Sequence, residues 1–283
     1  MTNKEINIRD PFVLCENGTY YMYGTRGKNF GMRTGGFDVY VGTDLENWSA
    51  PQAVFDSAKY GMNSGSNWAP EVHRFRGLYY LFATFTQPNG HRGTYALAAD
   101  SPLGPFRPTA EKPLTPEEWE SLDGTLWVEN GKPYLVFCHE HVQILNGTVC
   151  VVALSDDLSR AVSEPKLLFY GSEAYGVPEN PDGRYVTDGP FLHRAANGKL
   201  FMIWSTCPPT GYYQGLCVSE TGCVAGPWTQ LPPLYTKDGG HGMLFRDRDG
   251  VLRLTLHSPN RSPDERPVFF RVRESEERLD ITE

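Results

Sequence analysis

Ionisable side chains stand at the start of five strand-like segments spread along the chain: Asp10 in IRDP, Glu71 in NWAPEV, Asp123 in SLDGT, Asp188 in VTDGP and His241 in GGHGM. If these segments are equivalent strands around one axis, the side chains meet, and clustered carboxylates repel one another. Two uses fit the set: binding a cation through oxygen ligands, or acting as acid and base on either side of a substrate bond, as in glycosidases. For any one aspartate beside Pro or Gly, capping of a turn is a sufficient explanation. For the whole set we favour a functional site.

A repeated hairpin pattern predicts the strands that bring these residues together. Glycine followed by an aromatic and aliphatic run recurs at Gly18, Gly77, Gly131, Gly198 and Gly250, each time after another short strand-like segment. A third strand-like segment and a polar turn follow in four of the five units. Repeats of roughly 50 to 60 residues with four short strands each predict an all-β, five-bladed β-propeller with four-stranded antiparallel blades around a central axis. An irregular β-sandwich with coincidental hairpins is the alternative.

We expect a single catalytic domain over residues 1–283, because five such sheets account for the whole chain. The 29 Gly and 22 Pro, together with many aromatic residues, fit short strands joined by turns. The one helix that we predict covers residues 116–122 (PEEWESL), where a proline and early acids favour a first helical turn.

Charge and hydropathy argue against several kinds of partner. The net charge is −8 and no Lys/Arg cluster occurs, so nucleic acid is not expected. No stretch approaches the roughly 20 apolar residues that cross a bilayer, so a membrane is not expected either. The first residues, MTNKEINIRDP, lack the pattern of a secretory signal, and the six cysteines contain no CxxC pair. We therefore expect a cytoplasmic protein; its oligomeric state cannot be derived from these features.

At this point the motifs resemble glycoside hydrolase family 43. RDP, NWAPEV, LDG, TDGPFL and GGHGMLF occur in the order of that family, one in each repeat, across essentially the whole chain. The resemblance implies a five-bladed propeller that removes or cleaves α-L-arabinofuranosyl and β-D-xylosyl units with inversion. It implies Asp10 as the general base, Asp123 as the residue that tunes and holds the acid, and Asp188 as the acid. It also implies His241 as a ligand of a structural calcium or other cation on the axis, and no organic cofactor.

The fourth motif departs from this family, which has glutamate where the chain has Asp188. Aspartate is one methylene shorter, so for the same backbone its carboxyl group sits about 1.5 Å further back. Either a small backbone shift restores the distance, or another acid serves instead, such as Glu71, Glu140 or Glu179. We favour Asp188, because an aspartic acid with a raised pKa is a competent general acid. We expect burial and the charge of Asp123 to raise that pKa while Asp10 stays ionised.

Further side chains are candidates for sugar contacts, each with a structural alternative. Trp68 offers an apolar face for a sugar ring or packs within its blade. Glu71 binds a hydroxyl group or is only a strand-end acid. The remaining candidates are Phe30 and Arg33 in a glycine-rich loop, His139 and Glu140 in FCHEHVQ, and Arg266, which contacts substrate, pairs with Asp10 or forms a surface ion pair.

The leading hypothesis is an exo-acting α-L-arabinofuranosidase for short oligosaccharides. A β-xylosidase or an arabinan-cleaving enzyme is the close alternative. The shorter acid at Asp188 also motivates a carbohydrate-binding propeller without catalysis, although Asp10 and Asp123 argue against it, because a binding module has no need of a charged base.

Overall fold

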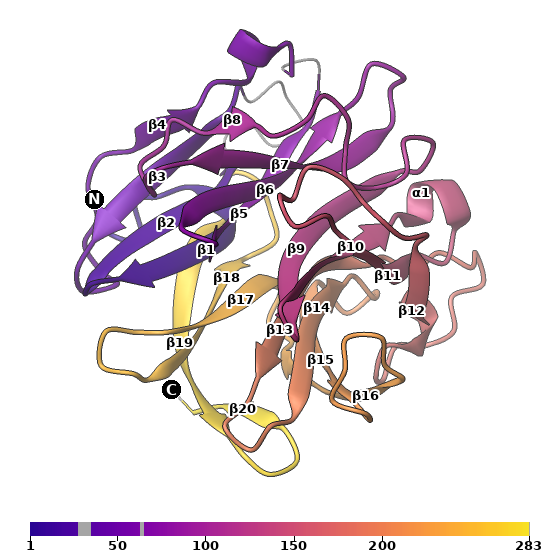
Figure 1. Cartoon of the computed structure of the whole chain (residues 1–283). Coiled ribbons are helices and arrows are strands. Elements are labelled where there is room, and N and C mark those ends of the chain that lie inside the picture. Colours follow the sequence, from indigo (N-terminus) through magenta and orange to yellow (C-terminus); the bar gives the residue numbers. More distant parts are fainter. Residues whose placement is uncertain (28–34, 63–64, 283) are drawn as a thin grey trace.

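The computed structural model describes residues 1–27, 35–62 and 65–282 and contains five four-stranded antiparallel sheets. Each sheet is made of four consecutive strands, and the sheets surround a central axis as propeller blades (Figure 1). The predicted five-bladed β-propeller is confirmed. Blades 1 and 2 contain β1 (Ile8–Glu16), β2 (Thr19–Arg26), β3 (Phe37–Gly42), β4 (Gln52–Phe55), and β5 (Asn67–Phe75), β6 (Leu78–Thr86), β7 (Arg92–Ala99), β8 (Arg107–Pro108). Blade 3 contains β9 (Ser121–Glu129), β10 (Lys132–His139), β11 (Thr148–Ala153) and β12 (Lys166–Tyr170). Blades 4 and 5 contain β13 (Asp188–Arg194), β14 (Leu200–Thr206), β15 (Tyr213–Ser219), β16 (Trp228–Tyr235), and β17 (Gly240–Arg246), β18 (Leu252–Ser258), β19 (Arg266–Glu274), β20 (Leu279–Ile281).

The glycines that mark the repeats lie in the turns between the first two strands of each blade. In blades 1 to 3 the turn has two residues, Asn17-Gly18, Arg76-Gly77 and Asn130-Gly131, and all six have positive φ. This is the backbone of a type I′ turn, whose twist matches that of the strands on either side. In blades 4 and 5 the connection is five residues long and also contains a positive-φ glycine. The hairpin prediction is thus confirmed in every blade.

The apolar core lies between the blades, where the faces of neighbouring sheets pack together. Four clusters of buried side chains fill these interfaces, one between each pair of consecutive blades, and the first cluster also takes in Met243 and Phe245 of blade 5. Aromatic rings cross the interfaces edge to face, as where Phe37 of blade 1 meets Phe85 of blade 2 at 5.8 Å between centroids. Such packing holds the first strands of all blades in a defined relation to the axis.

The first strand of every blade carries the same irregularity where it passes the axis. Its pairing with the second strand shifts register at that point in all five blades. Two residues lie inside each shift, and the first of them has positive φ: Asp10 (53°), Ala69 (49°), Asp123 (57°), Gly189 (47°) and His241 (50°). Left-handed backbone at a non-glycine residue costs on the order of 1–3 kcal/mol, and such strain and such bulges concentrate at functional sites.

This register corrects one prediction. Of the five residues that we aligned as equivalent, Asp10, Asp123 and His241 occupy the same position in their strands. Asp188 lies one position before the bulged residue, and Glu71 lies two positions after it. The position of the β-bulge in each strand sets which side chains are equivalent in space. Motifs that share Pro and Gly can therefore place their acidic residues at different positions relative to the bulge.

The predicted helix at residues 116–122 is wrong. That segment is a turn followed by β9, and its backbone oxygens are bonded by side chains: Asn89 donates to Glu117 O at 2.8 Å and Gln143 to Glu118 O at 2.9 Å. These bonds replace the i to i+4 bonds of a helix. The helix of this region is instead the single turn α1 (His141–Ile144), and the short 3-10 turns Ser57–Tyr60 and Gly171–Glu173 lie elsewhere. Within the described residues, no helix has the length and apolarity needed to span a membrane.

Candidate active site

A cavity of about 170 Å³ opens at the end of the axis where the first strands begin. It holds Asp10, Asp123, Asp188 and His241 together, with Trp68 and Glu140 from the sugar-contact candidates. Four further residues complete its wall: Arg9, Arg92, Leu122 and Tyr212. A larger surface hollow of about 600 Å³ beside Tyr60 and Met62 is lined by only one carboxylate, Glu111. The clustered acids therefore identify the smaller, axial cavity as the candidate site.

Asp10 is held in its ionised form. Its side chain is buried, accepts a 2.6 Å hydrogen bond from Thr25 Oγ1 at Oδ2, and places Oδ1 3.3 Å from His241 Nδ1. Burial alone favours the neutral acid, but the positive charges of His241 and Arg9 and the bond from Thr25 outweigh it, so the pKa of Asp10 lies below its ordinary value. A carboxylate in this state is a proton acceptor at neutral pH.

Asp123 and Asp188 show the opposite behaviour. Burial and the nearby carboxylates of Asp188 and Asp10 raise the pKa of Asp123 to about 7. The pKa of Asp188 is also raised, by burial first and by the charge of Asp10, although its side chain keeps part of its surface open to the cavity. Three buried carboxylates that repel one another do not all ionise together, so this side of the cavity retains a proton near neutral pH.

Two hydrogen bonds hold Asp188 in place. Asp123 Oδ2 accepts the backbone N–H of Gly189 at 3.1 Å, which positions the chain directly after Asp188. Tyr212 donates its hydroxyl hydrogen to Asp188 Oδ2 at 3.1 Å. Asp123 therefore orients Asp188 through the backbone, while the charge of Asp188 raises the pKa of Asp123.

His241 lies among the acids. Its Nδ1 is 3.3 Å from Asp10 Oδ1 and 3.6 Å from Asp123 Oδ2. Burial lowers the pKa of His241, but these carboxylates with Asp188 and Glu71 outweigh burial, so the net shift is upward. The distances are those of ion pairs, and across the described ranges no three His, Cys, Asp or Glu side chains are arranged to hold a metal ion. The axial cation that the resemblance implies therefore stays a prediction, with His241 as its expected ligand.

A second wall of the cavity is built by Arg92 at the start of β7. Its guanidinium lies 5.3 Å from the centre of the Trp68 ring, pairs with Glu120 (Nε to Oε2, 2.8 Å) and forms an ion pair with Glu140. Burial raises the pKa of Glu140 to about 7, with help from Asp188. Trp68 and Glu140 thus line the cavity and both contact an arginine that the motifs did not single out, while their contact with a sugar stays a prediction.

The other candidates within the described residues do not line this cavity. Glu71 pairs with His73 at 2.8 Å, and Phe12, which contacts the His73 ring, also meets Phe191 with ring centroids 6.1 Å apart. Glu71 is absent from the cavity wall because it lies after the bulge of β5. His139 stacks on Trp119 at 4.1 Å and contacts Gln143 at 2.7 Å, so its ring is packed beside the site.

Arg266 does not reach the site. It bonds to the backbone oxygens of Lys4, Pro263 and Glu265 and does not pair with Asp10. Glu179 is an exposed loop residue outside the cavity wall. Phe30 and Arg33 lie outside the described residues, so their role stays a prediction.

Sequence reasoning missed Arg9, Arg92, Leu122 and Tyr212. Arg9 and Leu122 directly precede Asp10 and Asp123, and both occupy the repeat position of Asp188 and Trp68, so the register shift identifies them. Arg92 begins β7, the third strand of blade 2, and Tyr212 directly precedes β15, the third strand of blade 4; no first-strand motif indicates either residue.

Comparisons with known proteins identify a family and agree with the propeller fold. A family model described as glycosyl hydrolases family 43 matches residues 4–273. A solved endo-arabinase from Bacteroides thetaiotaomicron VPI-5482 is 36% identical, with a TM-score of 0.88 over 98% of each chain. A probable arabinan endo-1,5-alpha-L-arabinosidase A of Aspergillus flavus is 23% identical, over 93% of this chain and 81% of the relative. An extracellular exo-alpha-(1->5)-L-arabinofuranosidase of Cellvibrio japonicus is 23% identical, over 86% of this chain and 72% of that protein.

Proposed function

From the premise that this chain belongs to glycosyl hydrolases family 43 and is a glycoside hydrolase, we propose that it cleaves α-L-arabinofuranosyl linkages in oligosaccharides with inversion. The names of its relatives support arabinose-containing substrates, since they include arabinanases and arabinofuranosidases. Family membership also sets aside the alternative of a sugar-binding propeller without catalysis.

In the proposed reaction Asp10 is the general base and Asp188 the general acid. Asp10 takes a proton from a water molecule as that water attacks the anomeric carbon. Asp188 gives its proton to the oxygen of the leaving group as the glycosidic bond breaks. Inverting enzymes separate the two carboxyl groups by about 6.5–9.5 Å so that the water fits between them. Asp123 keeps Asp188 protonated and oriented, and no step passes through a metal ion.

One observation carries this proposal: Asp10 and Asp188 line one cavity, with the pKa of Asp10 lowered and that of Asp188 raised. An acid and a base of this kind are recognised by environments that push their pKa values apart. The Tyr212 hydroxyl bonds the Asp188 carboxylate, and the bond from Gly189 N–H to Asp123 fixes the adjoining backbone, which supports Asp188 as the acid despite its shorter side chain.

A second candidate within the same chemistry is arabinan cleavage within the chain, which the endo-acting names among the relatives favour. In either case we propose that the Trp68 ring and Glu140 contact the sugar from the wall that Arg92 organises.

The test is hydrolysis of p-nitrophenyl α-L-arabinofuranoside, p-nitrophenyl β-D-xyloside and α-1,5-arabino-oligosaccharides by wild type and Asp188→Asn. We expect arabinosides to be preferred and NMR to show inverted configuration in the first product. Asp188→Asn should lose about 10²–10⁴-fold in kcat on oligosaccharides and less on the aryl glycoside, whose leaving group needs little protonation. If Asp188→Asn hydrolysed both the oligosaccharides and the aryl glycoside as fast as wild type, the acid would be another residue, and Glu140→Gln would be the next variant.

A further inference from the structure

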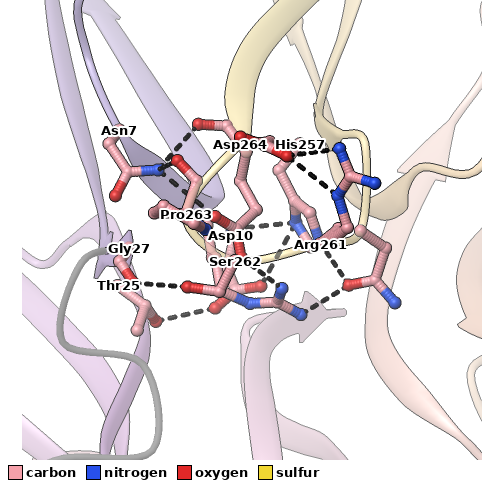
Figure 2. A network of polar contacts seen from close by, with 12 residues as sticks. Asn7, Asp10, Thr25, Gly27, His257, Arg261, Ser262, Pro263 and Asp264 are labelled. Carbon is pink, nitrogen blue, oxygen red and sulfur yellow. Dashed lines mark hydrogen bonds and ion pairs between the residues drawn. The ribbon is translucent and has the colours of Figure 1, made fainter.

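A loop of the last blade is hydrogen-bonded to the first blade beside Asp10 (Figure 2). We call residues 259–265, between β18 and β19, the closing loop. Asn7 Nδ2 donates to the backbone oxygens of Pro263 (2.8 Å) and Glu265 (3.0 Å), and Ser262 Oγ donates to Gly27 O (3.3 Å). Each blade is built from four consecutive strands, so the first and last blades share no strand. The ring is closed instead by this loop and by the contacts of β1 with β17, β18 and β19.

A buried ion pair links the closing loop to the cavity. Glu265 is fully buried and its Oε1 lies 2.9 Å from Arg9 Nη1. Arg9 Nη2 donates to Asn260 Oδ1 at 2.7 Å, and Arg9 itself lines the cavity next to Asp10. A carboxylate without solvent depends on such a partner, so the position of Arg9 is strongly determined by the loop.

The next link is His257, whose hydrogen-bonding state follows from its partners. The backbone N–H of Asp10 donates to His257 Nδ1 at 3.1 Å, so that nitrogen carries no hydrogen. The hydrogen is therefore on Nε2, which donates to Asn260 Oδ1 at 3.1 Å. Burial lowers the pKa of His257 to about 3, in agreement with a neutral ring. His257 Nδ1 also lies 3.4 Å from Asp10 Oδ1, but it has no proton to give to that oxygen.

We propose that Glu265, Arg9, Asn260 and His257 form a positioning relay that holds Asp10 in the geometry of a general base. The relay acts on the backbone: the Asp10 N–H bond to His257 stabilises the positive φ that aims the side chain into the cavity. The closing loop thereby couples closure of the ring to the orientation of the base. The inference rests on the proposed function, and its members are positioning residues.

The chain offers variants that separate the links of this relay. Asn260→Ala removes the acceptor shared by Arg9 and His257. His257→Asn places an amide oxygen where Nδ1 stands and so keeps an acceptor for the Asp10 N–H, whereas His257→Gln does not. Arg261→Ala is the matched control, because Arg261 is exposed in the same loop and its described side-chain contacts go to Asp264.

The experiment is steady-state hydrolysis of α-1,5-arabinotriose, with the melting temperature of each variant measured beside it. Misplacing a catalytic group by about 1 Å can cost 10²-fold, so we expect kcat of Asn260→Ala and His257→Gln to fall about 10- to 100-fold with KM within about twofold. His257→Asn should recover most of kcat, and Arg261→Ala should match wild type.

If wild type is active and Asn260→Ala has an unchanged kcat, the relay alone is overturned. The same holds if wild type is active and the kcat of His257→Asn is no higher than that of His257→Gln. A loss of kcat in Arg261→Ala equal to that of Asn260→Ala would show a general effect of the loop and would also overturn it. A wild type without hydrolysis of any arabinoside would overturn the proposed function and the relay with it.

Discussion

Asp10 in blade 1 and Asp123 in blade 3 occupy the same position of the repeat, yet their pKa values are shifted in opposite directions. Both are bulged residues with φ near 55°, at 53° and 57°, and both residues are 8% exposed. The pKa of Asp10 is lowered, whereas that of Asp123 is raised to about 7. Burial and backbone geometry are matched, so neighbouring groups decide the difference.

The neighbours differ at two places. The residue before the aspartate is Arg9 in blade 1 and Leu122 in blade 3, so Asp10 has an arginine next to it in the chain where Asp123 has an apolar side chain. Asp10 also accepts a hydroxyl hydrogen from Thr25, while Asp123 accepts a backbone N–H and faces Asp188. A repeated scaffold thus presents equivalent carboxylates, and a few local substitutions turn one into a base and another into the partner of an acid.

The largest expected effect comes from removing the ionised member of the comparison. Asp10→Asn keeps the size of the side chain and cannot accept the proton, so kcat should fall at least about 10³-fold. Arabino-oligosaccharide binding, measured by calorimetry, should persist. Asp249→Asn, an exposed change, serves as the control. Near wild-type kcat in Asp10→Asn would remove Asp10 from the role of base.

Arg9→Leu gives blade 1 the leucine that precedes the aspartate in blade 3. It leaves Glu265 buried without its cation, and breaking a buried pair in this way costs about 3–5 kcal/mol of the free energy of unfolding. Urea unfolding monitored by tryptophan fluorescence measures this, and Arg261→Leu, which alters an exposed pair, should change it by less than about 0.5 kcal/mol. Equal values for the two variants would contradict the importance of the pair.

Thr25→Val removes the hydroxyl donor that only Asp10 has. A hydrogen bond to an ionised group contributes about 1.5–3 kcal/mol, so the pKa of Asp10 should rise by about one to two units. A base with a higher pKa becomes protonated at a higher pH, and the acid limb of the kcat/KM profile should therefore move upward. Thr25→Ser keeps the hydroxyl and should leave the limb in place; a shift of equal size in both variants would disprove this explanation.

The smallest effect is expected from Tyr212→Phe on the opposite side of the cavity. The hydroxyl of Tyr212 donates to Asp188 and so favours its ionised form. Removing it should raise the pKa of Asp188 further and move the alkaline limb of the kcat profile to higher pH, with a change in kcat of only a few-fold. A downward movement of that limb would show that Tyr212 instead stabilises the protonated acid.

The repeat pattern alone was sufficient to predict the propeller. Hairpins with glycine in the turn are local structures, so Gly18, Gly77 and Gly131 indicate blades without knowledge of the remaining contacts. The motifs around Asp10, Asp123, Asp188 and His241 likewise predicted four residues of the cavity, because the starts of first strands converge on one axis. The predicted helix failed where side chains from distant segments bond the backbone of residues 117–118.

What the sequence determined by itself was therefore the number of blades and the acids at their axial ends. Only the tertiary structure decided the register of each bulge, which places Asp188 in the cavity wall and turns Glu71 toward His73. It also decided the partners, since Arg92 and Tyr212 reach the site from third strands and His257 from the opposite end of the chain. The physical reason is that hairpins form from neighbouring residues, whereas a pKa depends on whichever charges and donors the closed ring brings near.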